Sequence, residues 1–90
     1  MPLMKEEMET IIQIGKEFGV EKIWLFGSSL EETAANRDID IGVEGIDPAR
    51  FYRFLGRLGL ALNKNVDLID LDSTDPMRHI VRARGKVIYG

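Results

Sequence analysis

Residues 38–44 read DIDIGVE, and apolar side chains occupy every second position. A period of two predicts a β-strand that carries its branched apolar residues on one face: Ile39, Ile41 and Val43. Asp38 and Asp40 then share the other face, roughly 6.5 Å apart along the backbone. Their carboxylates can bind a hard cation such as Mg²⁺, which prefers oxygen ligands. Alternatively, the pair is a solvated strand face, since a D-x-D tripeptide also arises by chance.

A short apolar run, KIWLF at 22–26, precedes this strand and predicts a buried strand that stops at Gly27. Ser28 followed by Glu31 is a capping-box pattern, so we expect a short helix to begin there. Backbone N–H groups at a helix start can bind phosphate, and glycine lets a phosphate approach the backbone. The alternative is that Gly27 only makes the turn and Ser28 only caps the helix.

A third strand is predicted at 66–71, where the sequence reads VDLIDL. Asp67 is embedded near its start, so this carboxylate either meets solvent at the strand end or joins the Asp38 and Asp40 pair. Asp70 and Asp72 lie further along the segment, and we expect them to cap the following turn or face water.

The remaining elements are helices at 3–18, 47–63 and 75–84 and a last strand at 86–89. The order α-β-α-β-α-β-α-β predicts an α/β (α+β) fold with two layers and a mixed four-stranded sheet. A short connection after the first strand permits an antiparallel pair, whereas helical crossovers favour parallel pairs. We expect residues 1–90 to form a single domain.

In the helix at 47–63, we expect one apolar stripe to face the core: Phe51, Leu55, Leu58 and Leu62. Gly56 and Gly59 lie in the same helix, and each costs about 1 kcal/mol of helix stability relative to alanine. Close packing against the sheet or against a partner would explain them.

Composition limits the function further. The formal net charge is −3, which argues against general nucleic-acid binding because that depends on a basic surface. The chain has no cysteine, which excludes disulfides and thiolate zinc sites and fits a reducing compartment. No apolar run approaches the ~20 residues of a membrane span. We therefore expect a cytoplasmic protein that binds no membrane.

The order of these motifs resembles the DNA polymerase beta-like nucleotidyltransferase superfamily, and more narrowly its minimal nucleotidyltransferase family. The resemblance rests on LFGSS at 25–29, RDIDIGV at 37–43 and VDLID at 66–70. The closing stretch at 75–90 is also similar, so the resemblance covers most of the chain. Each motif is weak alone, whereas their order and spacing together are fairly specific.

The resemblance implies magnesium-dependent nucleotidyl transfer, with AMP from ATP (or another nucleoside triphosphate) as the group moved to an acceptor hydroxyl. Asp38, Asp40 and Asp67 would be catalytic and would bind two Mg²⁺ ions. Asp67 would also help to deprotonate the acceptor. The residues implied in nucleotide binding are Gly27, Ser28, Ser29 and Arg37.

Family members of this kind are often antitoxins of HEPN-type toxins, so the resemblance implies a protein partner that supplies the acceptor. A second copy of the chain is the other partner to consider. The sequence departs from the family where a small residue, Arg and Gly commonly follow Gly-Ser, because Glu31 and Glu32 stand there instead. The alternative function is therefore a binding module of weakened catalysis that neutralises its partner by covering it.

Overall fold

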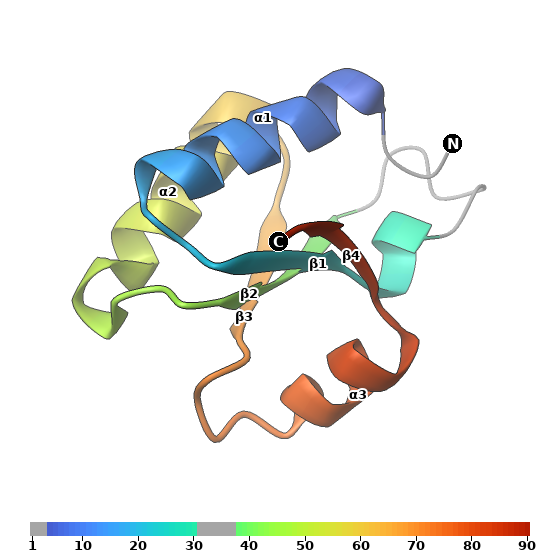
Figure 1. Ribbon diagram of the computed structural model, residues 1–90. Helices are drawn as coiled ribbons and strands as arrows, with labels where there is room; N and C mark the ends of the chain where they lie inside the picture. The colour runs from blue at the N-terminus through green and yellow to red at the C-terminus, as the bar shows by residue number, and fades with distance from the viewer. Residues whose placement is uncertain (1–3, 31–37) are drawn as a thin grey trace.

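The computed structural model describes residues 4–30 and 38–90, and these form a mixed sheet with helices on both faces (Figure 1). Within the described residues the strands are β1 (Lys22–Leu25), β2 (Ile39–Glu44), β3 (Val66–Asp70) and β4 (Lys86–Tyr89), in the spatial order β3-β2-β1-β4. β1 is antiparallel to both β2 and β4, whereas β2 and β3 are parallel. The predicted mixed four-stranded sheet is confirmed.

Two helices, α1 (Lys5–Glu17) and α2 (Phe51–Leu62), cover one face of the sheet (Figure 1). The alternating residues of β2 point at them, and Ile39, Ile41 and Val43 are at most 2% exposed. Phe18, just after α1, packs against Phe54 of α2, with the two ring centroids 5.1 Å apart. This layer holds the larger hydrophobic cluster.

The opposite face is covered by α3 (Met77–Arg84), so the predicted two-layer arrangement gains a helix on its second side (Figure 1). Val81 of α3 is fully buried in a small cluster with Phe26 and Leu71. Gly42 of β2 makes this contact possible, because a Cβ on that residue would lie 2.8 Å from Val81 Cγ1. A small residue is therefore required where α3 crosses the sheet.

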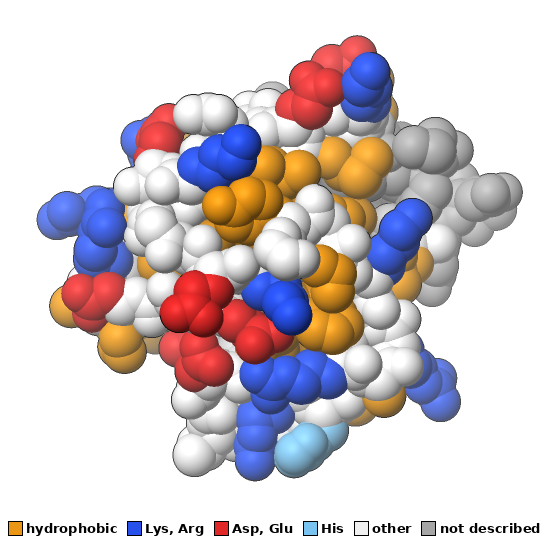
Figure 2. Space-filling model, viewed as in Figure 1, with side chains coloured by type: hydrophobic (Ala, Val, Ile, Leu, Met, Phe, Trp, Pro, Cys, Tyr) orange, Lys and Arg blue, Asp and Glu red, His pale blue; other side chains and the backbone are white. Residues whose placement is uncertain are grey.

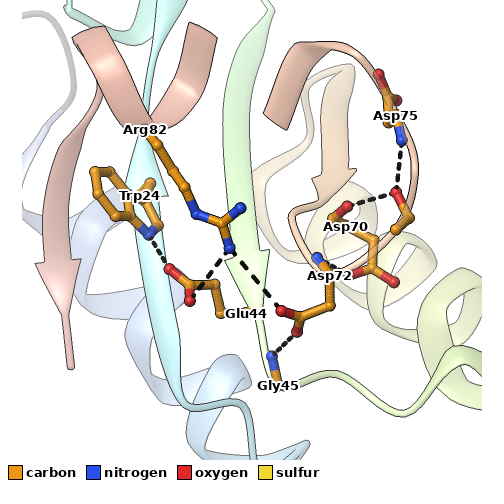
Figure 3. Close-up of polar contacts among 8 residues, drawn as sticks. Trp24, Glu44, Gly45, Asp70, Asp72, Asp75 and Arg82 are labelled. Carbon is orange, nitrogen blue, oxygen red and sulfur yellow. Dashed lines mark hydrogen bonds and ion pairs between the residues drawn. The ribbon is translucent and has the colours of Figure 1, made fainter. Parts of the chain in front are cut away.

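Polar contacts tie α3 and the turn after β3 to the sheet (Figure 3). Trp24 Nε1 donates to Glu44 Oε2 at 2.8 Å, and Arg82 pairs with Glu44 Oε1 at 3.5 Å and Asp72 Oδ1 at 3.9 Å. Asp72 Oδ2 accepts a hydrogen bond from Gly45 N at 2.8 Å. Partly exposed pairs of this kind contribute at most about 1 kcal/mol each, so they fix position more than they stabilise.

The region predicted as the helix at 47–63 begins with a 3₁₀ turn, η2 (Pro48–Arg50), whose N-cap Asp47 accepts a hydrogen bond from Ala49 N at 3.0 Å. The predicted stripe faces the core but omits Phe54, which is buried together with Leu58 and Leu62. Phe51 and Leu55 are half-buried and pack against the same cluster.

Of the two explanations for Gly56 and Gly59, close packing against the sheet is wrong. A Cβ on Gly56 would meet no described atom within 4 Å, and one on Gly59 would approach only Lys64 O, at 4.0 Å. Gly56 lies on the outer face of α2, between the exposed side chains of Tyr52 and Leu60. Contact with a partner stays the remaining prediction for these glycines.

Truncating Phe54 tests the revised core. Phe54→Ala should lower the free energy of unfolding by about 3–5 kcal/mol, because a fully buried ring leaves a cavity. Urea denaturation followed by circular dichroism measures the change. Leu60→Ala is the matched control, since Leu60 is 84% exposed and its loss should stay within about 0.5 kcal/mol. Equal losses in the two variants would contradict the assignment.

Candidate active site

The site lies where β2 and β3 begin, on the sheet face opposite α1 and α2. Asp38 immediately precedes β2, and Asp40 is its second residue. In the parallel pairing of β2 with β3, Asp40 lies directly opposite Asp67. Neighbouring strands are about 4.8 Å apart, so this register brings residues 27 positions apart in sequence next to each other. The predicted convergence of Asp67 on the D-x-D pair is what the strand pairing produces.

The Asp40 and Asp67 side chains are hydrogen bonded to each other. Desolvation raises the pKa of Asp67 above its ordinary value of 3.8. The negative charge of Asp40, the hydrogen bond to Asp40 and the charge of Asp38 raise this pKa further. A proton on Asp67 relieves the repulsion of adjacent carboxylates.

The loop between β1 and β2 holds Asp40 from the other side. This loop begins with η1 (Gly27–Leu30), a 3₁₀ turn rather than the predicted short α-helix. Phe26 N donates to Asp40 O at 3.2 Å, and Asp40 N donates to Ser29 Oγ at 2.7 Å. The backbone of Asp40 is therefore bonded on both sides to the segment that carries Gly27.

Gly27 has a φ of +55°, a conformation that favours glycine. A Cβ on Gly27 would lie only 2.5 Å from Asp40 Oδ2, so a side chain there would displace the carboxylate. The glycine thus places backbone, rather than a side chain, against the acidic group. A phosphate could approach this backbone, as the sequence predicts.

Ser29 has a structural role that the sequence did not reveal. Its side chain is 3% exposed, its hydroxyl accepts from Asp40 N, and its own N–H donates to Phe26 O at 3.1 Å. Its contact with a nucleotide stays a prediction, while its bonds within the fold position Asp40. Arg37 and the side chain of Ser28 lie outside the described part of the structure, and their roles also stay predictions.

The donor set fits magnesium in its chemistry, because it consists of carboxylate oxygens at a sheet edge. Among residues 4–30 and 38–90, no three Asp, Glu, His or Cys side chains are arranged as a complete metal centre. Magnesium seldom uses an all-protein cage and commonly takes one or two carboxylates with water and substrate phosphates. Asp38, Asp40 and Asp67 are thus suited to hold it jointly with a triphosphate.

A groove of about 530 Å³ adjoins Asp67 along β3, and sequence reasoning missed it. Its walls come from the start of α2, from β3 and from the turn that follows: Pro48, Phe51, Tyr52, Leu55, Val66, Asp67, Leu68, Asp70, Ser73 and Asp75. Asp70 and Asp72 were expected to cap the turn or face water. Asp70 caps it, since Asp70 Oδ1 accepts from Asp72 N at 3.0 Å, and Asp72 is exposed.

The family model described as Polymerase beta, Nucleotidyltransferase matches residues 9–90. The chain belongs to this family. The mixed sheet of the chain agrees with this family's fold. No curated protein matches this nucleotidyltransferase-family chain.

Several solved structures that are similar to this nucleotidyltransferase-family chain are toxin–antitoxin proteins. An MntA–HepT toxin–antitoxin structure is similar at a TM-score of 0.77 and 27% identity, covering 97% of this chain and 73% of that chain. A toxin–antitoxin structure with AMP-PNP has a TM-score of 0.74 and 28% identity, covering 92% and 73%.

A third structure contains a tri-AMPylated Shewanella oneidensis HEPN toxin in complex with an MNT antitoxin. Its TM-score is 0.75 at 26% identity, covering all (100%) of this chain and 73% of that chain. The resemblance to minimal nucleotidyltransferases is confirmed by these neighbours. Within the part of the chain that is described, no helix has the length and apolar character needed to cross a membrane.

Replacing Ser29 tests its support of Asp40. Ser29→Ala should lower the free energy of unfolding by about 1–3 kcal/mol, because the N–H of Asp40 loses its acceptor. Urea denaturation measures the loss. Ser73→Ala is the control, because the Ser73 hydroxyl donates to Asp70 O and accepts from Asp75 N in an exposed turn, where water can replace both bonds. If Ser29→Ala were as stable as Ser73→Ala, the result would contradict the role of Ser29 in supporting Asp40.

Asp67→Asn tests the repulsion among the carboxylates. The pKa of Asp67 is raised in the folded state, so the protonated carboxyl favours folding. This contribution to stability is fully present below pH 3.8, the ordinary pKa of aspartate, and is lost as the pH rises through the folded-state pKa. Without added metal, Asp67→Asn should therefore be more stable than the wild type at pH 7, within about 1 kcal/mol because the group is exposed.

Thermal unfolding from pH 3 to pH 8 measures the difference between Asp67→Asn and wild type. The difference should shrink as pH falls and should be smallest below 3.8, where the wild-type carboxyl is protonated in both states. Asp47→Asn, at an exposed cap remote from the site, controls for general charge effects. A pH-independent difference would contradict the repulsion.

Proposed function

We propose that this chain is a magnesium-dependent nucleotidyltransferase that moves AMP from ATP to a hydroxyl of a HEPN-type partner, and so acts as the antitoxin of a toxin–antitoxin pair. Family membership supports the reaction class. The similar structure with AMP-PNP supports a nucleotide substrate, and the complex with an AMPylated HEPN toxin supports the acceptor.

One observation carries the proposal: the in-register pairing that sets Asp67 beside Asp40, with Gly27 against the same carboxylate. An unrelated domain would have no reason to bring two acidic side chains into hydrogen-bond contact, because their repulsion is unfavourable without a cation. Asp38, Asp40 and Asp67 would hold Mg²⁺. When bound, Mg²⁺ would offset the charge of the triphosphate and polarise the phosphoryl group.

The residues of the chain then have distinct tasks. The backbone at Gly27 and Ser28 holds the β and γ phosphates. Asp67 accepts the proton of the acceptor hydroxyl. The hydroxyl oxygen forms a bond to the α phosphorus, the bond from that phosphorus to the bridging oxygen breaks, and pyrophosphate leaves.

A second candidate is a binding module that neutralises the partner without transfer. The observation that favours it is Glu31-Glu32, which puts two acids where related sequences commonly carry a phosphate-binding arginine. Arg37 is the cation that would compensate for this change in an active enzyme. The two functions differ in whether the aspartates are needed for neutralisation.

Calorimetric titration of ATP, with and without magnesium, tests the nucleotide site. Wild type should bind only with magnesium, and Asp38→Asn/Asp40→Asn should lose binding because the metal ligands are gone. Asp47→Asn should bind as wild type does, because its carboxylate caps η2 far from the site. Binding that survives the double substitution would place the nucleotide elsewhere.

Mass spectrometry of the HEPN-type partner after incubation with ATP tests transfer. One or more added AMP groups are expected, and the double variant should react at least ~100-fold more slowly. If the double variant still neutralises the partner while transfer is absent, the binding-module function replaces the enzyme.

A further inference from the structure

β3 is the edge strand of the sheet beside the active site. In the described residues it pairs only with β2. Two hydrogen bonds at the ends of the β2–β3 pair fix the direction of the peptide groups of β3: Ile39 N donates to Asn65 O at 2.9 Å, and Leu71 N donates to Val43 O at 2.9 Å. In a parallel pair alternate residues face the same neighbour, so the odd-numbered residues of β3 face β2. The peptide groups of Val66 and Leu68 therefore face outward.

The groove beside β3 runs along this outward edge. Val66, Asp67 and Leu68 all line it, although consecutive strand residues point to opposite faces. A groove lined by three consecutive residues of β3 and by the start of α2 therefore lies along the edge of the sheet, beside α2. The outward N–H and C=O groups of β3 lie along this groove, and an added strand would form hydrogen bonds with such groups.

The edge strand is short and carries charge, and both features limit non-specific strand pairing. The strand sequence VDLID at 66–70 contains two aspartates, no lysine and no proline. The two negative charges disfavour an acidic or purely apolar segment, whereas a segment with a basic residue can pair with them. Without proline, the N–H groups of the edge are kept, and the groove lies beside them.

The two ends of the groove differ in chemistry. The start of α2 contributes an apolar wall with Phe51, Leu55 and Tyr52, and the Tyr52 side chain is 80% exposed. The turn after β3 contributes the carboxylates of Asp70 and Asp75. The surface in Figure 2 also shows acidic side chains gathered near the end of β3 and α3, beside basic ones.

We infer that this groove binds an extended segment of the acceptor protein as an added strand on β3, and that the segment carries the hydroxyl to Asp67. The inference rests on the proposed transfer to a protein hydroxyl. Asp67 belongs both to the groove and to the Asp40 pair, so one segment can contact β3 and reach the reacting carboxylate.

The groove also specifies the sequence of the segment. An apolar residue would contact Phe51 and Leu55, and a lysine or arginine would pair with Asp70 and Asp75. Asp67 and Asp70 are three residues apart, roughly 10 Å along the strand. The basic residue therefore lies about three positions from the residue that carries the hydroxyl.

Val66→Pro tests strand addition directly. Proline removes the outward N–H of the first residue of β3, a position where it is tolerated without loss of pairing to β2. With the HEPN-type partner as the acceptor, KM for the partner should rise about tenfold, while the Kd of ATP with magnesium stays unchanged. Val66→Ala is the matched control, because it removes side-chain contacts and keeps the N–H.

Asp70→Asn/Asp75→Asn provides a second variant that preserves the turn. Asparagine can still accept from Asp72 N and Met77 N, the bonds made by the two carboxylates at 3.0 and 2.9 Å. KM for the partner should rise, and the increase should diminish at high salt because the lost attraction is electrostatic. Thermal unfolding verifies that both variants are folded.

Hydrogen exchange of the chain with the partner, without nucleotide, tests docking independently of transfer. The amides of Val66 and Leu68 should become protected, whereas those of Asp67 and Ile69, which already face β2, should change little. Protection in this experiment, combined with no added AMP on the partner in the mass-spectrometric assay with ATP, would uphold the docking site and reject the proposed enzyme, so the two failures are distinguishable.

Three results would overturn the inference. Equal KM values for Val66→Pro and Val66→Ala would exclude strand addition. A raised Kd for ATP in the groove variants, with KM for the partner unchanged, would assign the groove to the nucleotide. Protection of the Val66 and Leu68 amides that depends on the concentration of the chain alone would assign it to a second copy.

Discussion

The parallel pairing of β2 with β3 is the constraint on which both the core and the site depend. Its register sets Asp40 beside Asp67, and at the same time sets Ile41 beside Leu68 on the face of α1 and α2. A slip of one residue would exchange the two faces and bring carboxylates into the core. Burial of the isoleucines therefore stabilises the arrangement of the aspartates, although the aspartates repel one another.

Backbone hydrogen bonds hold Asp40 in place beside Asp67. Phe26 N donates to Asp40 O, and Asp40 N donates to Ser29 Oγ. Burial and the neighbouring negative charges of Asp40 and Asp38 raise the pKa of Asp67. Such a cluster is suited to a cation, whose positive charge offsets the repulsion among the carboxylates.

The arrangement of the helices leaves one edge of the sheet accessible. α1 and α2 cover one face and α3 covers part of the other, while β3 remains at the edge (Figure 1). A chain of 90 residues has little surface to spare for an acceptor pocket. Main-chain bonds along an edge strand provide affinity without a deep pocket, and this suits a small enzyme that acts on another protein.

The sequence by itself determined the elements and their order, because periodicity and turn residues act locally. The DIDIGVE alternation placed Asp38 and Asp40 on one face, and Asp47-Pro48 and Gly85 marked helix boundaries. The motif order also indicated the family. The family match and the structure confirm these predictions.

Only the tertiary structure decided the features that depend on how elements meet. In α2 the structure adds Phe54 as a fully buried residue and leaves Phe51 and Leu55 half-buried, because the depth of each residue depends on what packs against the helix. The buried Ser29 hydroxyl accepts a hydrogen bond from Asp40 N, and a Cβ on Gly56 would contact no described atom. The approach of Asp67 to Asp40 and the open edge of β3 arise from strand order and register, which are long-range pairings that no local pattern encodes.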